Sequence, residues 1–234
     1  MKQQTEKFIY SGENDFRNLY GNIVAEKRSV YNSSKFLTPY FEREDLSSKE
    51  KVCIGNYQDF LSRNLQKNDW NFEIPENWMQ KSWCYVINSY CRDEKFKEKM
   101  TPFEINLVEE TIQGIDSAIE KSKTDKEYIL YRGVSDLRWL SRPYEGETFC
   151  EKAFGSFSSD IEQIQNYINP KNSIIFQLEL LPNTNVLYLD SHEKEFLRPR
   201  NKTYEITKIE KRFIQVKQTD KVETIVYRIT EKED

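Results

Sequence analysis

The chain has 234 residues, of which 32% are charged and 37% hydrophobic, and its formal net charge is −4 at pH 7. This length fits one domain, or one domain with an extension, and the mixing of acidic and basic residues along the chain argues against a nucleic-acid partner. No apolar run reaches the length of a membrane span, and the first residues, MKQQTEKFIYSGEND, lack the apolar region of a signal peptide. We therefore expect a protein that is made in the cytosol and has no membrane partner, although delivery into a host cell by an unconventional export or injection route would leave no trace in the sequence.

Helical patterns fill the first half of the chain. Apolar residues spaced by three and four, together with capping signals, predict helices at 14–31, 51–65, 76–96 and 104–122. The spacing of Ser47 and Glu50 matches a capping box before the second of these helices. Thr101, Pro102 and Glu104 make a stronger start signal, because a Thr cap, a Pro at the first helical position and a Glu three residues after the cap occur together.

The second half of the chain is predicted to form a series of short strands. These β-type segments are at 127–134, 173–181, 184–190, 195–199, 202–210, 212–218 and 223–230. One short helix is predicted among them, at 160–168. Helices followed by a run of strands indicate an α+β fold rather than alternating βαβ units. We expect one domain at 46–234 with its helices packed on the sheet, and an added helical arm at 1–45.

The cysteines and the histidine argue against a disulfide or a metal site. Cys84 and Cys91 fall on one predicted helix, where a rise of about 1.5 Å per residue places them about 10 Å apart, which is too far for a disulfide. Cys53 and Cys150 complete the set, which has no CxxC spacing, and the chain contains a single histidine. We therefore expect free thiols and no metal.

Two glutamates, Glu193 and Glu195, flank Lys194 where the chain begins a predicted strand. Side chains two residues apart on a strand lie on the same face, and like charges side by side on a sheet repel each other. The pair therefore indicates either a solvated strand edge or two carboxylates with a shared function.

Two other short motifs precede this pair, Tyr131-Arg132-Gly133 at the end of a strand and Ser156-Phe157-Ser158 before a helix. The order of the three resembles the Arg–Ser–Glu group of mono-ADP-ribosyltransferases, which includes the enzymatic subunits of clostridial binary toxins, the vertebrate ecto-enzymes and the Alt and Mod enzymes of T-even phages. The resemblance extends to YVINSYCR at 85–92 and EKEFLRPRNKTYEI at 193–206, and it covers about residues 50–230. It implies N-terminal helices packed on a split, mainly antiparallel β-sandwich of the ADP-ribosyltransferase type.

The resemblance implies NAD as the substrate and arranges several residues around it. Arg132 would bind the NAD pyrophosphate, because a guanidinium fork matches phosphate oxygens bidentately; without the other motifs it would be taken for a surface arginine that closes a strand. Gly133 would let the backbone approach the ligand closely. Ser156 would support the geometry of the catalytic glutamate, and Ser158 matches the last position of the same motif, although both serines also fit a strand that leads to an ordinary helix cap.

Three further NAD contacts are implied less directly. Asn88, with Tyr85 one turn before it, resembles the NAD-contacting residues of the family's helix, while a buried asparagine that caps a neighbouring loop fits the same pattern. Tyr167 lies where the family often places an aromatic residue against nicotinamide. Packing with Ile164 and Ile168 on one helix face is the simpler explanation of Tyr167.

The resemblance gives the two glutamates unequal roles. Breaking the bond between ribose and nicotinamide develops an oxocarbenium-like charge on the ribose, as in glycoside hydrolysis. Glu195 would hold the ribose 2′-hydroxyl and stabilise that charge in the transition state. Glu193 would face the acceptor and help to deprotonate it, and in the family a glutamate at this position goes with arginine acceptors.

This chain departs from the family in the segment that precedes the two glutamates. Only Ser191 and His192 separate the segment 184–190 from Glu193, whereas the family usually has a longer loop there that grips the protein target. The sequence therefore leaves the target protein open, and an NAD glycohydrolase that uses water as acceptor is the first alternative. A catalytically silent binding module is the second, although such a module has no need of three intact motifs.

Overall fold

The computed structural model describes residues 35–58, 83–134, 143–164, 173–190, 194–216 and 220–232. The predicted helix at 14–31 and most of the N-terminal arm lie outside these residues, as do Tyr167, His192 and Glu193. Within them the helices precede the strands along the chain, as the sequence predicts.

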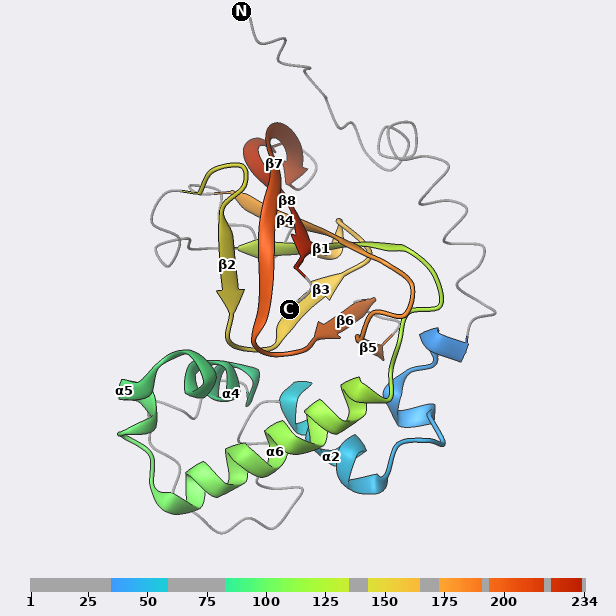
Figure 1. Cartoon of the computed structure of the whole chain (residues 1–234), viewed down its shortest axis with the longest axis vertical. Helices are drawn as coiled ribbons and strands as arrows, with labels where there is room; N and C mark the ends of the chain where they lie inside the picture. Colours follow the sequence, from blue (N-terminus) through green and yellow to red (C-terminus); the bar gives the residue numbers. More distant parts are fainter. Residues whose placement is uncertain are drawn as a thin grey trace, which may run out of the picture.

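The helical elements are η1 (Lys35–Leu37), η2 (Tyr40–Glu42), α2 (Ser48–Gln58), α4 (Trp83–Arg92), α5 (Glu94–Lys97) and α6 (Pro102–Glu120). The strands are β1 (Tyr128–Val134), β2 (Thr148–Glu151), β3 (Gly155–Ser158), β4 (Ile174–Leu180), β5 (Leu187–Asp190), β6 (Glu195–Arg198), β7 (Lys202–Val216) and β8 (Asp220–Glu231). Helices α2, α4, α5 and α6 gather on one side of the sheet (Figure 1).

Both predicted capping boxes are confirmed. The Ser47 N–H donates to Glu50 Oε2 at 2.7 Å, and the Glu50 N–H donates to Ser47 Oγ at 3.3 Å. At the start of α6 the Thr101 N–H donates to Glu104 Oε2 at 2.6 Å, the Glu104 N–H donates to Thr101 Oγ1 at 3.3 Å, and Pro102 takes the first helical position. Each box satisfies N–H groups that have no partner inside the helix.

Two predicted helices differ from expectation in their described parts. The stretch 76–96 is divided at Asp93, whose carboxylate accepts from the Lys95 N–H at 2.9 Å and so caps α5 as a separate turn. An aspartate inside a helical pattern competes with the backbone in this way. In the stretch 160–168, the described residues 161–164 form turns and 3₁₀ geometry. Cys84 and Cys91 share α4, as predicted, and all four cysteines are free.

The described strands form one mainly antiparallel sheet in the order β2-β7-β8-β4-β1-β3-β6-β5, in which only β4 and β8 pair in parallel. The predicted fold class is confirmed. Strand β1 pairs with β4 along its whole length, from Tyr128↔Leu180 to Val134↔Ile174. With β3 it shares the single register pair Tyr131↔Ser158. The sheet is therefore split into a five-stranded and a three-stranded part that meet at this joint.

Two strands were not predicted in the form they take. β2 has four residues, of which only Phe149 is buried, so it carries no visible alternation of apolar and polar side chains. The predicted strands 202–210 and 212–218 are joined, in their described part, into the single strand β7. Its pairing with β8 runs from Tyr204 to Val216 and continues across Lys211, the one residue between the two predicted segments.

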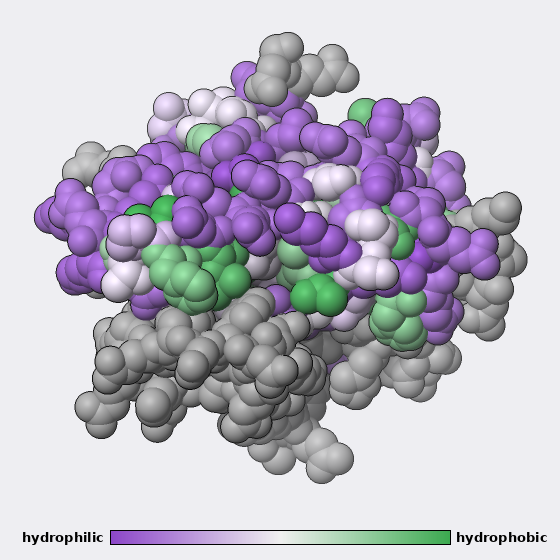
Figure 2. Space-filling model, turned by 90° about the horizontal axis from the view of Figure 1, so that it is seen from below, coloured by the Kyte–Doolittle hydropathy of each residue, from purple (hydrophilic) through white to green (hydrophobic). Residues whose placement is uncertain are grey.

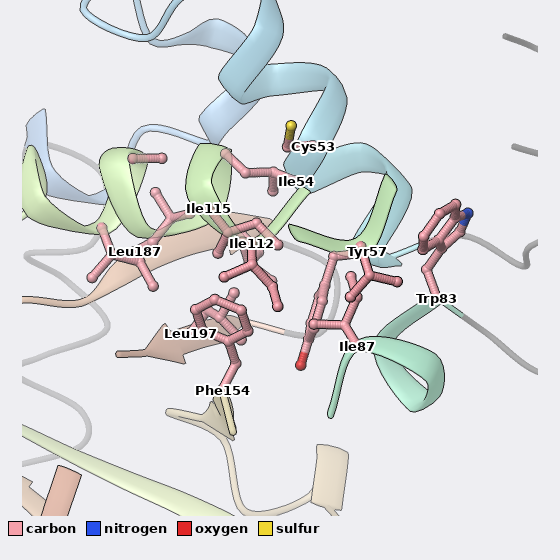
Figure 3. Close-up of a cluster of buried hydrophobic side chains, with 14 of the residues drawn as sticks. Cys53, Ile54, Tyr57, Trp83, Ile87, Ile112, Ile115, Phe154, Leu187 and Leu197 are labelled. Carbon is pink, nitrogen blue, oxygen red and sulfur yellow. The ribbon is translucent and has the colours of Figure 1, made fainter. Parts of the chain in front are cut away.

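The first hydrophobic core lies between the helices and the sheet (Figure 3). It joins residues of α2, α4 and α6 to Phe154, Leu187 and Leu197. The two helices α2 and α6 cross closely at Gly114, where an added Cβ would lie 2.5 Å from Cys53 Sγ. Only a glycine allows this approach, so α2 and α6 pack at a short distance within the helical layer.

A second core fills the other side of the sheet and includes part of the predicted arm. Its buried residues include Leu130, Phe176 and Phe196. The Phe36 ring lies 5.4 Å from the Tyr128 ring and 6.1 Å from the Phe196 ring, measured between centroids. The described end of the 1–45 segment therefore packs against the domain, and the boundary at residue 45 stays a prediction.

The described surface on the helical side is mostly hydrophilic, with hydrophobic residues in small separate groups (Figure 2). The exposed large hydrophobic side chains of the helices include Val52 on α2, Tyr85 on α4 and Phe103 on α6. None of the helices in the described ranges is long and apolar enough to cross a membrane.

The buried carboxylate of Glu50 joins the start of α2 to the end of α6. Besides capping α2, it accepts from Ser117 Oγ at 2.6 Å and from Lys121 Nζ at 2.7 and 2.9 Å. Burial raises the pKa of this carboxyl, but the hydrogen bonds from Lys121, Ser117 and Ser47 outweigh burial and lower the pKa from 4.5 to about 2. The folded state therefore favours the ionised form.

We expect Glu50→Gln to lower the free energy of unfolding at pH 7 by about 3 kcal/mol, since the pKa falls from 4.5 to about 2 and each pKa unit corresponds to about 1.4 kcal/mol. Because the folded pKa lies below the unfolded value, this contribution is complete above pH 4.5 and fades as the pH falls toward about 2. Urea denaturation at several pH values measures the difference between the two proteins. Glu110→Gln is the control, since Glu110 lies 4.0 Å from Lys49 with both side chains 66% exposed; equal losses in both variants would contradict the prediction.

Candidate active site

The predicted motifs meet where the two parts of the sheet join. Arg132 lies on β1, one residue after Tyr131, which pairs with Ser158 of β3. On the other edge of β3, Ser158 pairs with Glu195, the first residue of β6. The short strand β3 thus lies directly between the strand that carries the arginine and the strand that carries the glutamate.

Glu195 is held through both of its oxygens. Ser156 Oγ donates a hydrogen bond to Glu195 Oε1. Ser156 lies two residues before the partner of Glu195 in the register, so the long glutamate side chain reaches its diagonal neighbour on the same face. Gln58 Nε2, at the end of α2, lies 3.5 Å from Glu195 Oε2. The carboxylate is therefore oriented by the sheet on one side and by the helical layer on the other.

The prediction that Glu193 and Glu195 lie on the same face of a strand assumes extended backbone at Lys194, and this assumption is wrong. The Lys194 φ of 49° lies in the left-handed region, and β6 begins only at Glu195. The turn is stabilised by an ion pair from Lys194 Nζ to Asp160 Oδ2 at 2.5 Å and by a hydrogen bond from the Ser159 N–H to the Lys194 carbonyl at 3.2 Å. Alternation along a strand therefore cannot set the direction of Glu193, and the role of that residue stays a prediction.

Arg132 is partly buried and ion-paired. Its Nη1 lies 3.2 Å from Glu151 Oε2, and its side chain is 24% exposed. The guanidinium carbon lies 5.9 Å from the centroid of the Phe157 ring. Gly133 follows in β1, opposite Ile175. The environment is that of an arginine held in one place rather than one that extends freely into solvent.

Asn88 faces the interior and Tyr85 faces outward. Asn88 Nδ2 donates to the Tyr57 hydroxyl at 3.0 Å, while Asn88 Oδ1 is buried and has no hydrogen-bond partner among the described residues. Tyr85 is 47% exposed, and its ring lies edge-on to Phe96 at 6.4 Å. The two candidates on α4 therefore do not lie together.

Tyr57 links Asn88 electrostatically to the other site residues. Its ring packs edge-on against Phe154 at 5.9 Å, between α4 and the sheet (Figure 3). Burial raises the pKa of the Tyr57 hydroxyl, and the charge of Glu195 raises it further, while the Asn88 hydrogen bond and the charge of Arg132 lower it. The buried Tyr57 hydroxyl is thus hydrogen-bonded to Asn88 and lies within electrostatic range of Arg132 and Glu195.

Sequence reasoning missed Tyr57, Gln58 and Glu151. The first two end a helix whose pattern predicts only a buried face, and the third ends a strand that was not predicted. No short motif contains any of them. Their proximity to the site follows from the packing of α2 on the sheet and from the path of β2, neither of which a local pattern reveals.

Comparisons with known proteins agree with the fold. A family model described as ADP-ribosyltransferase exoenzyme matches residues 79–230. None of the curated protein sequences matches the chain. The enzymatic component C2-I of the Clostridium botulinum C2 toxin is 16% identical, with a TM-score of 0.56 over 89% of this chain and 47% of that one.

Two further toxins are similar in structure. Plx2a, an ADP-ribosyltransferase toxin from Paenibacillus larvae, is 16% identical with a TM-score of 0.55 over 93% of this chain and 97% of that one. The ADP-ribosylating toxin BECa of C. perfringens, solved with NADH, is 18% identical with a TM-score of 0.56 over 97% and 50%. The chain thus spans about half the length of C2-I and BECa.

The family match covers more than half of the chain and includes all three motifs. The arginine, serine and glutamate of those motifs lie on neighbouring strands in the described structure. The chain therefore belongs to the ADP-ribosyltransferase exoenzyme family.

Proposed function

We propose that the chain is an NAD-dependent mono-ADP-ribosyltransferase that moves ADP-ribose from NAD to an arginine of a target protein and releases nicotinamide. The observation that carries this proposal is the hydrogen bond from Ser156 to Glu195, one strand away from Arg132. Membership in the exoenzyme family supports NAD as the substrate. The similar toxins support action in a host cell, on a protein that is still to be identified.

Arg132 binds the NAD pyrophosphate in this proposal. A guanidinium has five N–H donors, and within the described part of the chain only Nη1 of Arg132 donates, to Glu151. The remaining donors are available for phosphate oxygens. Ser158, Gly133, Asn88 and the exposed Tyr85 are proposed as further NAD contacts, and so is Tyr167, which lies outside the described residues.

Glu195 stabilises the transition state. When the bond between ribose C1′ and the nicotinamide nitrogen breaks, the bonding electrons leave with nicotinamide and positive charge develops on the ribose. A carboxylate fixed in advance by Ser156 and Gln58 needs no reorganisation to stabilise that charge. The acceptor nitrogen then forms a bond to C1′, and its proton passes to Glu193.

We expect Glu195→Gln to lower both ADP-ribose transfer and NAD hydrolysis by about a hundredfold or more, because it removes the main electrostatic stabiliser of the cation. Ser156→Ala should give a smaller loss of kcat, since the carboxylate remains but is less well oriented. Steady-state release of nicotinamide measures both effects. Glu179→Gln, at an exposed position of β4, is the matched control. Full activity of Glu195→Gln would remove this residue from the mechanism.

Arg132→Lys should raise the Michaelis constant for NAD by about tenfold or more, because a lysine offers a point charge in place of a planar fork. Arg212→Lys serves as the control, since Arg212 pairs with Glu210 on β7. Circular dichroism checks that both variants fold. Unchanged NAD kinetics in Arg132→Lys would remove Arg132 from the substrate site.

The acceptor is proposed to be arginine on account of Glu193. A guanidinium stays protonated in proteins, so it becomes a nucleophile only when a carboxylate draws it close and accepts a proton. Agmatine should therefore accept ADP-ribose slowly without any protein target, and Glu193→Gln should lose this transfer while keeping some NAD hydrolysis. Mass spectrometry of modified lysate proteins identifies the acceptor. ADP-ribose only on other side chains would refute arginine, and hydrolysis without any transfer would favour an NAD glycohydrolase.

A further inference from the structure

One carboxylate, Glu151, connects two arginines that come from different parts of the chain. Its Oε2 lies 3.2 Å from Nη1 of Arg132 on β1. Its Oε1 lies 3.0 Å from both Nε and Nη2 of Arg92 at the end of α4. The Glu151 side chain is only 11% exposed and that of Arg132 24%, whereas the Arg92 side chain is 42% exposed and lies at the rim of the cluster.

The path of the chain fixes this carboxylate. β2 and β1 are separated by three strands in the order of the sheet, yet Glu151 at the end of β2 contacts Arg132. Residues 152–154 alone connect β2 to β3, so the end of β2 must lie beside the joint of the sheet. Within this connection the Ala153 N–H donates to Glu151 Oε1 at 3.1 Å. The Ala153 N–H and Arg92 thus both bind Oε1 of Glu151, while Oε2 of Glu151 binds Arg132.

The contacts hold Arg132 on two sides. Glu151 binds one end of its guanidinium, and the Phe157 ring lies 5.9 Å from the guanidinium carbon. A long arginine side chain loses rotamer freedom when it binds a ligand, and a partner that restricts it beforehand removes part of that cost. Two guanidinium groups and one carboxylate also leave a net positive charge at this place, which still favours an anion.

We propose that Glu151 is a positioning residue for NAD binding: Arg92 and the Ala153 N–H fix its carboxylate, and the carboxylate holds Arg132 ready for the pyrophosphate. This inference rests on the proposed role of Arg132. A carboxylate that competed with the phosphate groups for Arg132 would have the opposite effect on NAD affinity.

Calorimetric titration with NAD tests the inference on the full chain without depending on turnover. Glu151→Gln keeps the size of the side chain and removes its charge, so the dissociation constant of NAD should rise about tenfold. In an Arg132→Lys background, Glu151→Gln should change the dissociation constant of NAD by less than about twofold, because the effects of coupled residues are not additive. Glu205→Gln is the control, since Glu205 lies on β7 and pairs with the exposed Lys232 at 3.1 Å.

Each of the following titration results would overturn or support the role proposed for Glu151. Tighter NAD binding by Glu151→Gln would show competition and overturn the inference, and so would equal losses in the two backgrounds. If Glu151→Gln does not fold, Glu151→Asp replaces it, because aspartate keeps the charge on a shorter side chain. We then expect NAD binding about threefold weaker than in the wild type. Unchanged or tighter binding by Glu151→Asp overturns the inference. An Arg132→Lys variant that binds NAD as wild type does would instead refute the proposed role of Arg132 at the pyrophosphate, on which this inference rests.

Discussion

The candidate site depends on the short strand β3, which pairs with a strand of each part of the sheet. β3 contains only Gly155–Ser158, and it pairs with β1 at one residue and with β6 along its whole length. At its start an added Cβ on Gly155 would lie 2.9 Å from the Phe157 ring and 3.4 Å from Arg198 Cβ. Close packing at Gly155 therefore holds β6 against one edge of β3, while pairing at Ser158 places the arginine strand β1 on the other edge.

The predictions that succeeded come from interactions between residues close in sequence. The capping boxes at Ser47 and Thr101 are set by local hydrogen bonds. The strands at 127–134 and 173–181 coincide with short runs rich in apolar, β-branched and aromatic residues, which a sequence displays directly. The site motifs were found by resemblance, because Arg132 and Glu195 are far apart in sequence and no local rule connects them.

The failures have long-range causes. β2 has one buried side chain, and its pairing with β7 spans more than fifty residues of chain, so no local pattern marks it as a strand. The left-handed turn at Lys194 is stabilised by Asp160, which belongs to a segment before β4. Gln58 reaches Glu195 only because α2 packs on the sheet. In each case a tertiary contact decides the local structure or the composition of the site.

A buried ion pair fixes the far end of β6, the strand that begins with Glu195. Arg198 ends β6, is fully buried, and donates to the Asn185 carbonyl and to Glu231 of β8. A slip of β6 by one residue would turn Glu195 to the opposite face. The same slip would leave the Arg198 charge buried without its partner, which typically costs about 3–5 kcal/mol. The register that places Glu195 beside Ser156 is therefore enforced by a charge three residues further along the strand, on the side of the sheet away from the proposed chemistry.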